Sequence, residues 1–527
     1  MPITEMLSRN ARMYPHETAL IEREPAVNRR REISWLEFES TANKFANALL
    51  ASGVGKGDKV VHLMMNNLEW LPTYFGILKT GAMAVPLNFR FTAAEIRKCI
   101  GAAEGKVLVY GPEFRDKIDE ISDQLHHVEK FIFVGKDCPE KAESYDEIIR
   151  KYPADAPDVT FFDYDSAAIY FTSGTTGDPK PILLTHDNLV SACISENRHH
   201  LQNHNDNFVC IPPLYHTGAK MHWFGNLIVG SKAVILRGMK PQWILEAISE
   251  EKATIVWLLV PWAQDILDAI ESGEVDLNDY HLEQWRLMHI GAQPVPPSLI
   301  RRWQKYFPGQ QYDTNYGLSE STGPGCVHLG MENMHKVGAI GLPGFNWETM
   351  IVDSSGNPVP QGNVGELIVR GPGVMKGYYK NPEATSNVLK NGWLYTGDMA
   401  QQDEDGFIYL VDRKKDVVIT GGENIFPVEI EDFLRSHDDI KDAAVIGMPD
   451  NRLGEIPVAI VEVKLGRKLS ESMVIEFCEK LPRYKRPHKV FFDKVPRNPT
   501  GKIEKPKLRE EYCGKREVLN LEDRCLK

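Results

Sequence analysis

The chain has no long hydrophobic run and no cysteine framework. Its longest apolar stretches, such as Ile255–Trp262, are far too short to cross a bilayer, and the first residues lack the apolar core of a signal peptide. The eight cysteines are scattered without a Cys-x-x-Cys pair, which argues against a disulfide framework or zinc ribbon. We therefore expect a cytoplasmic protein without a transmembrane segment, and leave a peripheral membrane contact open.

The chain also lacks an excess of basic residues. Its 527 residues include 73 acidic and 61 basic side chains, a formal net charge of −12. Such a chain is not expected to bind nucleic acid through phosphates, although a local basic pocket can still hold an anionic cofactor. Hydrophobic residues make up 42%, which is ordinary for a globular enzyme. The composition leaves monomer and homodimer equally open.

Strand-like and helical segments alternate over the first two thirds of the chain. Strands are expected at Lys59–Met64 and Lys232–Leu236, and helices at Trp35–Leu50 and Ala93–Ala103, an alternation typical of an α/β fold. From about Gly338 short strands and turn residues predict a small β-barrel-like unit. The residues after the charged stretch 412–416 predict a small α+β domain. We expect a large N-terminal domain over residues 1–412 and a C-terminal domain over 416–527.

One glycine- and threonine-rich run follows the strand-like segment Ser166–Tyr170. Its small donors and one cation suit a polyphosphate, because glycines let backbone N–H groups point at one spot. It is not a Walker A loop, which needs four residues between its glycines. A plain surface loop is the alternative. The candidate phosphate-binding residues are Thr172, Ser173, Gly174, Thr175, Thr176, Gly177 and Lys180.

Four further motifs carry chemical groups that suit a magnesium nucleotide. In the segment 312–320, Tyr316 offers a flat face for a base, Ser319 a hydroxyl donor for a phosphate and Glu320 a ligand for Mg²⁺. Asp398 can accept two ribose hydroxyls. The other two motifs are the segment 412–425 and a loop-tip lysine, Lys502. Each motif alone could equally be a turn or a solvated surface.

Taken together, the five motifs resemble in order and spacing those of the adenylate-forming superfamily, which includes acyl-CoA synthetases, luciferases and peptide-synthetase adenylation domains. The resemblance extends from the segment 15–20 to Lys502, and the segment 421–425 without a carrier domain looks most like stand-alone CoA ligases. It implies two half-reactions. A carboxylic acid first reacts with ATP and Mg²⁺ to give acyl-adenylate and pyrophosphate. The thiol of CoA then displaces AMP.

The resemblance also implies a role for each motif residue. The phosphate loop would hold the β- and γ-phosphates, Ser319 the α-phosphate and Glu320 the Mg²⁺. Tyr316 would stack on adenine, and Lys502 would bridge the reacting carboxylate and α-phosphate. The residues implied around the adenine are Gly291, Ala292, Asn315 and Gly317, and those at the ribose are Asp398 and Arg413.

Between the half-reactions the family swings its C-terminal domain, which implies a mobile domain and a hinge at 413–415 with Lys415 as the hinge residue. The resemblance places Gly421 and Gly422 beside the pantetheine tunnel and Arg486 at the CoA nucleotide, and Arg90 could meet a phosphate. Two departures keep the catalytic groups. Pro181 stands where glycine is usual, and Ser319 where threonine is commoner.

The acyl site is implied around the segment 213–224, with His216 near the substrate carboxylate. Bulky side chains there, namely Trp223, Trp257, Trp262 and Met221, favour short, medium, cyclic or aromatic acids, although each could be a core residue. Lys220 could pair with a second substrate charge or reach solvent. The histidine-rich segment 199–204 has no carboxylate or cysteine companion in the sequence, so we expect a polar helix end and no metal site.

Two other functions stay open at this point. An enzyme of this kind could pass the acyl group to a carrier protein or to oxygen in place of CoA. The chain could also be a nucleotide- or acyl-binding relative without turnover, although Lys502, Glu320, Asp398 and Arg413 argue against that.

Overall fold

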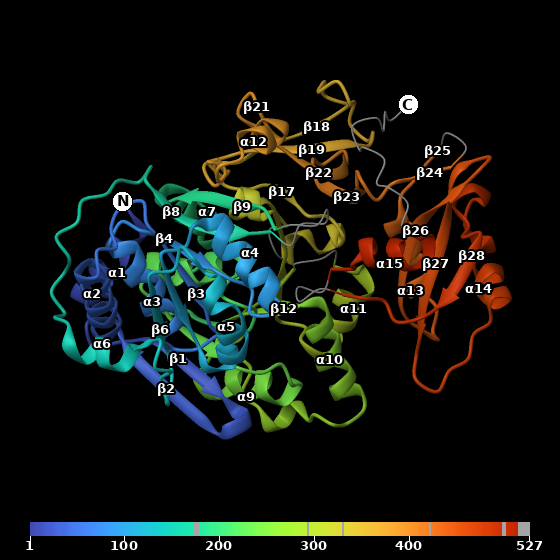
Figure 1. Ribbon diagram of the computed structural model, residues 1–527. Coiled ribbons are helices and arrows are strands. Elements are labelled where there is room, and N and C mark those ends of the chain that lie inside the picture. The colour runs from blue at the N-terminus through green and yellow to red at the C-terminus, as the bar shows by residue number, and fades with distance from the viewer. Residues whose placement is uncertain (173–178, 292–294, 329–330, 421–422, 498–501, 515–527) are drawn as a thin grey trace.

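A computed structural model describes the chain apart from residues 173–178, 292–294, 329–330, 421–422, 498–501 and 515–527. Figure 1 shows a large body, which contains the N-terminus, and a smaller body beside it that holds the last helices and strands. Two large sheets form the centre of the large body. The described part therefore has the α/β class and the two-part layout that the sequence predicts.

The first large sheet has seven strands in the order β14-β13-β12-β10-β11-β1-β2. All neighbours pair in parallel except the edge strand β2, which pairs antiparallel with β1. Its central strands are buried on both faces, as a sheet covered by helices requires. The strands are β1 (Thr18–Glu24), β2 (Arg29–Ser34), β10 (Asn207–Cys210), β11 (Lys232–Leu236), β12 (Ile255–Leu259), β13 (Leu287–Gly291) and β14 (Gln311–Asp313).

The second large sheet has eight strands in the order β20-β9-β8-β4-β3-β5-β6-β7. Strands β8 and β9 pair antiparallel and flank the glycine- and threonine-rich run. The strands are β3 (Lys59–Leu63), β4 (Met83–Pro86), β5 (Val107–Tyr110), β6 (Lys130–Phe133), β7 (Glu143–Ser144), β8 (Ser166–Phe171), β9 (Pro181–Thr185) and β20 (Gly377–Tyr378).

Helices of the large body begin at polar caps that the sequence encodes. In α2, the Ser34 hydroxyl accepts from the Glu37 N–H at 3.2 Å while the Glu37 carboxylate accepts from the Ser34 N–H at 2.8 Å. Thr92 and Glu95 repeat this box at α4. The helices are α1 (Ile3–Met13), α2 (Trp35–Ala51), α3 (Trp70–Lys79), α4 (Ala93–Ala103), α5 (Arg115–Ile121), α6 (Tyr145–Lys151), α7 (His186–His200), α8 (Thr217–Val229), α9 (Pro241–Glu251), α10 (Val260–Glu271), α11 (Pro297–Tyr306) and α12 (Pro382–Val388).

A β-rich unit follows the two large sheets. A three-stranded sheet in the order β15-β16-β17 precedes an antiparallel sheet in the order β18-β19-β22-β21, with β23 paired to β22. The strands are β15 (Asn315–Gly317), β16 (Pro324–Val327), β17 (Leu342–Pro343), β18 (Glu348–Val352), β19 (Gly365–Arg370), β21 (Leu389–Lys390), β22 (Trp393–Gln402) and β23 (Ile408–Arg413).

The smaller body has one sheet in the order β25-β24-β27-β26, with β28 parallel to β27. Two apolar clusters lie within this body, and a small third cluster joins Met399 and Val411 of the β-rich unit to Val417. The elements are β24 (Val418–Thr420), β25 (Glu423–Ile425), α13 (Pro427–Arg435), β26 (Ile440–Asp450), β27 (Gly454–Val463), α14 (Glu471–Phe477), β28 (Lys489–Phe492) and α15 (Lys505–Cys513).

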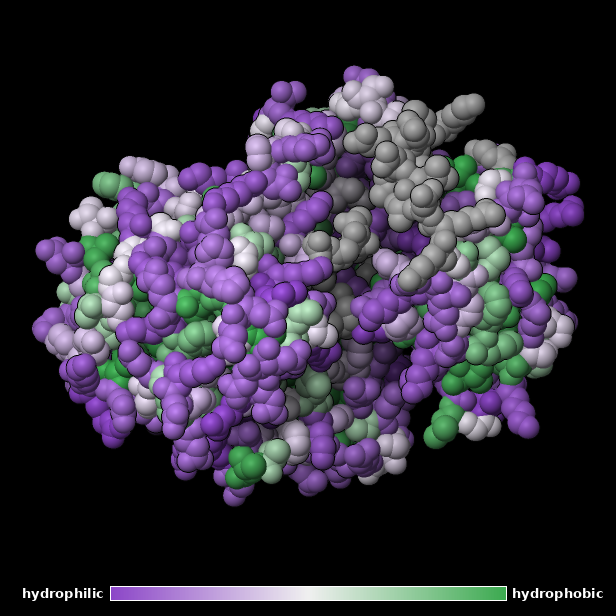
Figure 2. Space-filling model, viewed as in Figure 1, coloured by the Kyte–Doolittle hydropathy of each residue, from purple (hydrophilic) through white to green (hydrophobic). Residues whose placement is uncertain are grey.

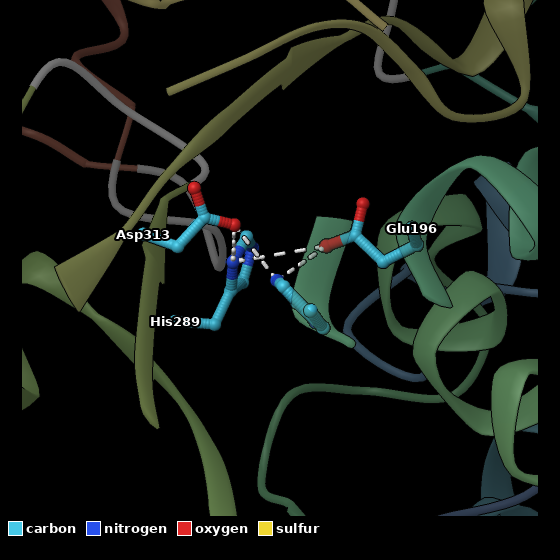
Figure 3. Close-up of side chains that lie close together, drawn as sticks. Glu196, His289 and Asp313 are labelled. Carbon is cyan, nitrogen blue, oxygen red and sulfur yellow. Dashed lines mark hydrogen bonds and ion pairs between the residues drawn. The ribbon is translucent and has the colours of Figure 1, made fainter. Parts of the chain in front are cut away.

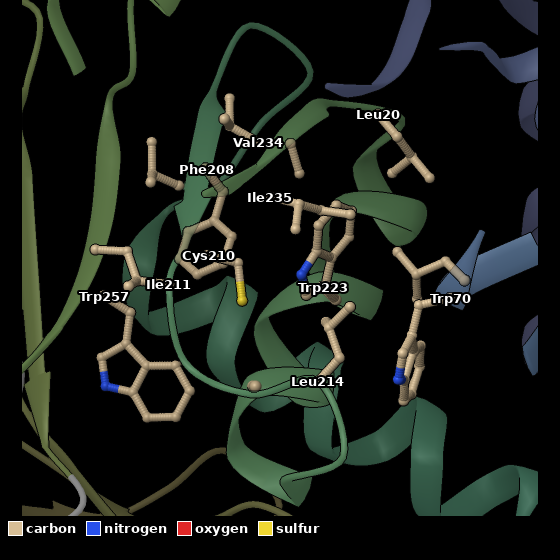
Figure 4. Close-up of a cluster of buried hydrophobic side chains, with 14 of the residues drawn as sticks. Leu20, Trp70, Phe208, Cys210, Ile211, Leu214, Trp223, Val234, Ile235 and Trp257 are labelled. Atoms are coloured by element: carbon tan, nitrogen blue, oxygen red, sulfur yellow. The ribbon is translucent and has the colours of Figure 1, made fainter. Parts of the chain in front are cut away.

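The largest apolar core lies around the seven-stranded sheet. Figure 4 shows the Trp223 ring packed beside Ile235 and Leu214, while Trp257 lies on the far side of Ile211. Trp223 is 2% exposed and Trp257 6% exposed. Trp223 belongs to α8 and Trp257 to β12, so both the helix and the sheet contribute large aromatic side chains to this core.

Among the described residues no helix combines the length and apolar character needed to span a membrane. None of the seven cysteines that the structure describes forms a disulfide. Figure 2 shows hydrophilic side chains over most of the visible face of both bodies.

Candidate functional site

The phosphate-loop candidates begin where β8 ends. The Thr172 N–H donates to the Lys180 carbonyl at 3.2 Å and closes the base of the loop. Ser173, Gly174, Thr175, Thr176 and Gly177 lie outside the described residues. Lys180 places its Nζ 5.4 Å from the centre of the Tyr378 ring. The loop base is thereby tied to β20.

Tyr378 is a site residue that sequence reasoning missed. Its hydroxyl donates to Glu320 Oε1 at 2.9 Å, so one tyrosine contacts both Lys180 and Glu320. Burial and the neighbouring Glu320 carboxylate raise the pKa of Tyr378 far above its ordinary value, which keeps it a neutral donor. No local pattern indicated this residue, because Tyr378 and Glu320 are 58 residues apart in the chain.

Asp398 is the centre of the nucleotide-side candidates. Tyr316 donates its hydroxyl to Asp398 Oδ2 at 2.5 Å, and Arg413 Nε lies 2.8 Å from Asp398 Oδ1. Arg413 and Asp398 face each other because β22 and β23 pair in the register Asp398↔Arg413. The Asp398 carboxylate raises the pKa of Arg413 although burial opposes it. The structure thus brings together three residues of three predicted motifs.

Lys502 reaches this group from the smaller body. It precedes Ile503, which pairs with Arg497 and closes the base of its loop. The Lys502 side chain is exposed to solvent. Desolvation by nearby protein atoms and the charge of Arg413 still lower its pKa to about 8, while Asp398 and Glu320 act in the opposite direction. Lys502 therefore lies within electrostatic reach of the nucleotide-side acids of the large body.

His216 lies at the start of α8. Its ring is tilted against Tyr215, with ring centres 4.7 Å apart. Burial, together with the charges of Lys502 and Arg90, lowers its pKa to about 3. His216 is therefore neutral at physiological pH. The same charges show that Arg90 and Lys502 lie near this ring.

The acyl-side candidates are packed and apolar. A Cβ added at Gly218 would meet the Trp257 ring at 2.8 Å, so the α8 backbone lies directly against this indole. Trp223 and Trp262 are also buried. The side chains of Lys220 and Met221, like Ala292, lie outside what the structure describes.

Three further predicted residues, Asn315, Arg486 and Lys415, lie in defined surroundings. Asn315 donates its side-chain amide to Glu196 Oε2 at 2.9 Å. Arg486 donates to the carbonyls of Leu481 and Glu479 at 2.9 and 2.6 Å, which stabilises its own loop. Burial lowers the pKa of Lys415 to about 8.

Three more predicted residues lie on the nucleotide side. Gly291 ends β13, where an added Cβ would lie 3.8 Å from Thr314 Oγ1, and Gly317 ends β15. Ser319 begins a half-buried 3₁₀ turn that also contains Glu320. Gly421 and Gly422 fall outside the described residues. The roles of Asn315, Arg486, Lys415 and these residues stay predictions.

Comparisons with known proteins identify the family of this chain. A model of the AMP-binding enzyme family matches residues 7–379, and a model of the AMP-binding enzyme C-terminal domain matches residues 429–502. Long-chain-fatty-acid–CoA ligase FadD13 of Mycobacterium tuberculosis is 32% identical over 97% of this chain and 98% of its own. Feruloyl-CoA synthase of an Amycolatopsis species is 32% identical over 96% of this chain and 98% of its own.

A solved structure gives the same result. O-succinylbenzoate coenzyme A synthetase (MenE) from Bacillus subtilis, in complex with ATP and a magnesium ion, has a TM-score of 0.83 at 26% identity and covers 97% of this chain and 99% of its own. Both family models and full-length relatives match this sequence. The chain therefore belongs to the AMP-binding enzyme family and stands, within it, among the acid–CoA ligases.

Proposed function

We propose that this chain activates a carboxylic acid with ATP to an acyl-adenylate and then transfers the acyl group to CoA, with release of AMP. The observation that carries the proposal is that Lys502 lies close enough to Asp398, Glu320 and Arg413 for their charges to act on it. A cation from one domain faces the acids and the guanidinium of the other domain. This is where an anionic nucleotide and an anionic acid would have to be brought together.

The nucleotide would be bound by the residues around Asp398. The two oxygens of Asp398 already accept from Tyr316 and Arg413, which fixes the carboxylate for the ribose hydroxyls. The Tyr316 ring, held through its hydroxyl, would stack on adenine. Ser319 would donate to the α-phosphate, and the Thr172–Lys180 loop would hold the outer phosphates.

Charge is the main barrier in the first half-reaction. The carboxylate of the acid attacks the α-phosphorus, a P–O bond forms, and the bond to pyrophosphate breaks with its electron pair on the leaving group. Lys502 would neutralise charge on both reacting oxygens, and a positioned cation of this kind lowers a barrier by about 3–4 kcal/mol. Neutral His216 would orient the acid without adding charge.

Glu320 fits a resident Mg²⁺ site. Its carboxylate is half-buried and oriented by the Tyr378 hydroxyl, and carboxylate oxygen is the ligand that Mg²⁺ prefers. Mg²⁺ bound there would supply charge neutralisation for the phosphates. Tyr378 orients the carboxylate, and Lys180 adds a fixed positive charge on the other side of the same ring.

For the second half-reaction we propose that the domain after residue 415 rotates. The CoA sulfur attacks the acyl carbon, the new C–S bond forms, and AMP leaves with the electrons of the broken C–O bond. Lys502 would leave the site, and Gly421 and Gly422 would let pantetheine pass. Arg486 would meet the CoA nucleotide.

The acid is proposed to be short, medium, cyclic or aromatic. Trp257 lies against Gly218 at the backbone of α8, which leaves little depth for a long chain at this point. The two relatives are named for acids as different as a long-chain fatty acid and ferulate. Similarity to them therefore does not indicate which class of acid this chain uses. A monomer or homodimer in the cytoplasm remains our expectation.

The test is AMP release by the full-length protein with ATP, Mg²⁺, CoA and a panel of carboxylic acids. We expect AMP release with at least one acid, and we expect it to require CoA and to match the amount of CoA consumed. Pyrophosphate exchange without CoA-dependent AMP release would favour another acyl acceptor. Absence of exchange with every acid would favour a binding protein without turnover.

A further inference from the structure

Four ionisable side chains meet in the interior beneath the nucleotide motif. Glu196 and His200 come from α7, His289 from β13, and Asp313 from β14. All four are buried, with exposures of 3% or less. Figure 3 shows the Asp313 and Glu196 carboxylates pointing toward imidazole nitrogens that lie between them. Burying two carboxylates and two imidazoles needs a physical explanation, because buried charges are costly unless compensated.

This cluster corrects an expectation from the sequence. The segment 199–204 does end a helix, but the prediction that its histidines have no carboxylate companion is wrong for His200. Its Nε2 lies 3.0 Å from Glu196 Oε1, one helical turn earlier, and 2.8 Å from Asp313 Oδ2. The fold supplies the second of these partners from a distant strand. No spacing rule within the segment could have indicated it.

The ligand atoms have the separations of a four-coordinate metal site. His200 Nε2 lies 2.8 and 3.0 Å from the two carboxylates, and His289 Nδ1 lies 3.5 and 3.7 Å from the same two oxygens. All four atoms lie within 4.8 Å of one another. Ligands bound tetrahedrally at about 2.0–2.2 Å are roughly 3.3–3.6 Å apart. An ion at the centre would widen the two His200 pairs by roughly 0.3–0.8 Å and leave the two His289 pairs nearly unchanged.

Charge and hydrogen bonding favour a cation in the centre. One imidazole nitrogen faces two carboxylates, and Asp313 Oδ1 is buried with no hydrogen-bond partner among the described residues. Asn315 donates to the other Glu196 oxygen at 2.9 Å, the kind of outer hydrogen bond that orients a ligating carboxylate.

We propose that Glu196, His200, His289 and Asp313 bind one divalent transition-metal ion of the Zn²⁺ class. Two imidazole nitrogens and two carboxylate oxygens are a ligand set for Zn²⁺ and its neighbours, and Mg²⁺ would prefer oxygen ligands alone. Four protein ligands make the site closed and structural. The ion joins α7 to β13 and β14, directly beneath Asn315 and Tyr316.

The test measures metal in the full-length protein, purified without an affinity tag or chelator and then dialysed against Zn²⁺ at neutral pH. We expect about one tightly bound Zn²⁺ per chain. Replacing Zn²⁺ by Co²⁺ should give the intense visible absorption of a tetrahedral site. His289→Ala and Asp313→Asn should each lower bound metal by roughly tenfold or more. His204→Ala, a partly exposed histidine outside the cluster, should bind as the wild type does.

Less than a tenth of an ion in folded wild-type protein after Zn²⁺ dialysis would overturn the proposal and leave a proton-sharing network. Retention of full metal by both ligand variants would overturn it too. If the variants do not fold, the wild type decides: a strong chelator should lower its melting temperature, and added Zn²⁺ should restore it. No change on chelation of a loaded sample would contradict the site. The ligase proposal is independent of these outcomes.

Discussion

The nucleotide side and the acyl side of the proposed site are built by different means. On the nucleotide side, Asp398 and Arg413 face each other because two adjacent strands pair in register. Polar atoms there are joined at hydrogen-bond distance. On the acyl side, Trp257 meets Gly218 through packing between a strand and a helix. The first side is specified by short motifs, and the second by shape.

The comparison predicts its largest effect at Asp398. Asp398→Ala removes the hydrogen-bond acceptor of Tyr316 and leaves the half-buried Arg413 guanidinium without its carboxylate partner. We expect kcat/KM for ATP in pyrophosphate exchange to fall by about 10²- to 10³-fold. Asp353→Ala, a turn carboxylate of the same β-rich unit that accepts from Ser355 and Asn357, is the matched control and should change little. Equal losses of exchange activity in the two variants would contradict a specific role of Asp398 in nucleotide binding.

Trp257→Ala should change the preference among acids and leave the use of ATP nearly unchanged. Removing the indole beside Gly218 opens space for longer acids, so the ratio of kcat/KM for long against short acids should rise by about 10- to 100-fold. KM for ATP should stay within about twofold of the wild type. A kinetic panel of acids checks this, with Trp393→Ala as the control, since Trp393 packs on Arg370 in the β-rich unit. An unchanged acid preference would contradict the acyl-site assignment.

What the sequence could predict follows the same division. The strand β11 and the helix α4 have the bounds expected from the alternation of strand-like and helical segments. Tyr316, Asp398 and Arg413 were predicted because each lies in a contiguous motif. The contact of Tyr378 with Glu320 and that of His200 with Asp313 were not, because each joins residues far apart in the chain. Such contacts depend on sheet order, which local patterns do not specify.

Tyr378→Phe tests the residue that the motifs missed. The substitution removes one hydroxyl that orients Glu320, so pyrophosphate exchange should fall by roughly tenfold, with a higher Mg²⁺ requirement. Tyr379→Phe is the control, because its hydroxyl contacts Glu104 instead. A Tyr378→Phe enzyme with wild-type Mg²⁺ dependence would remove Tyr378 from the nucleotide side.

The smallest effect concerns pH. A lysine is charged below its pKa, and Lys502 has a pKa of about 8 in the free enzyme. If the charged form is required, kcat/KM for pyrophosphate exchange should decline as pH rises through about 8, approaching tenfold per pH unit. Lys502→Arg keeps its charge and should remove this decline, at a lower absolute rate. A decline of the same shape in Lys502→Arg would assign it to another group.

The most direct test of the central claim is to separate the two half-reactions in Lys502→Ala. Our account predicts that pyrophosphate exchange falls by about 10²- to 10³-fold, while thioester formation from supplied acyl-adenylate and CoA stays near the wild-type rate. Equal loss of both half-reactions, or exchange at the wild-type rate, would contradict the claim that Lys502 is needed for adenylation and not for thioester formation.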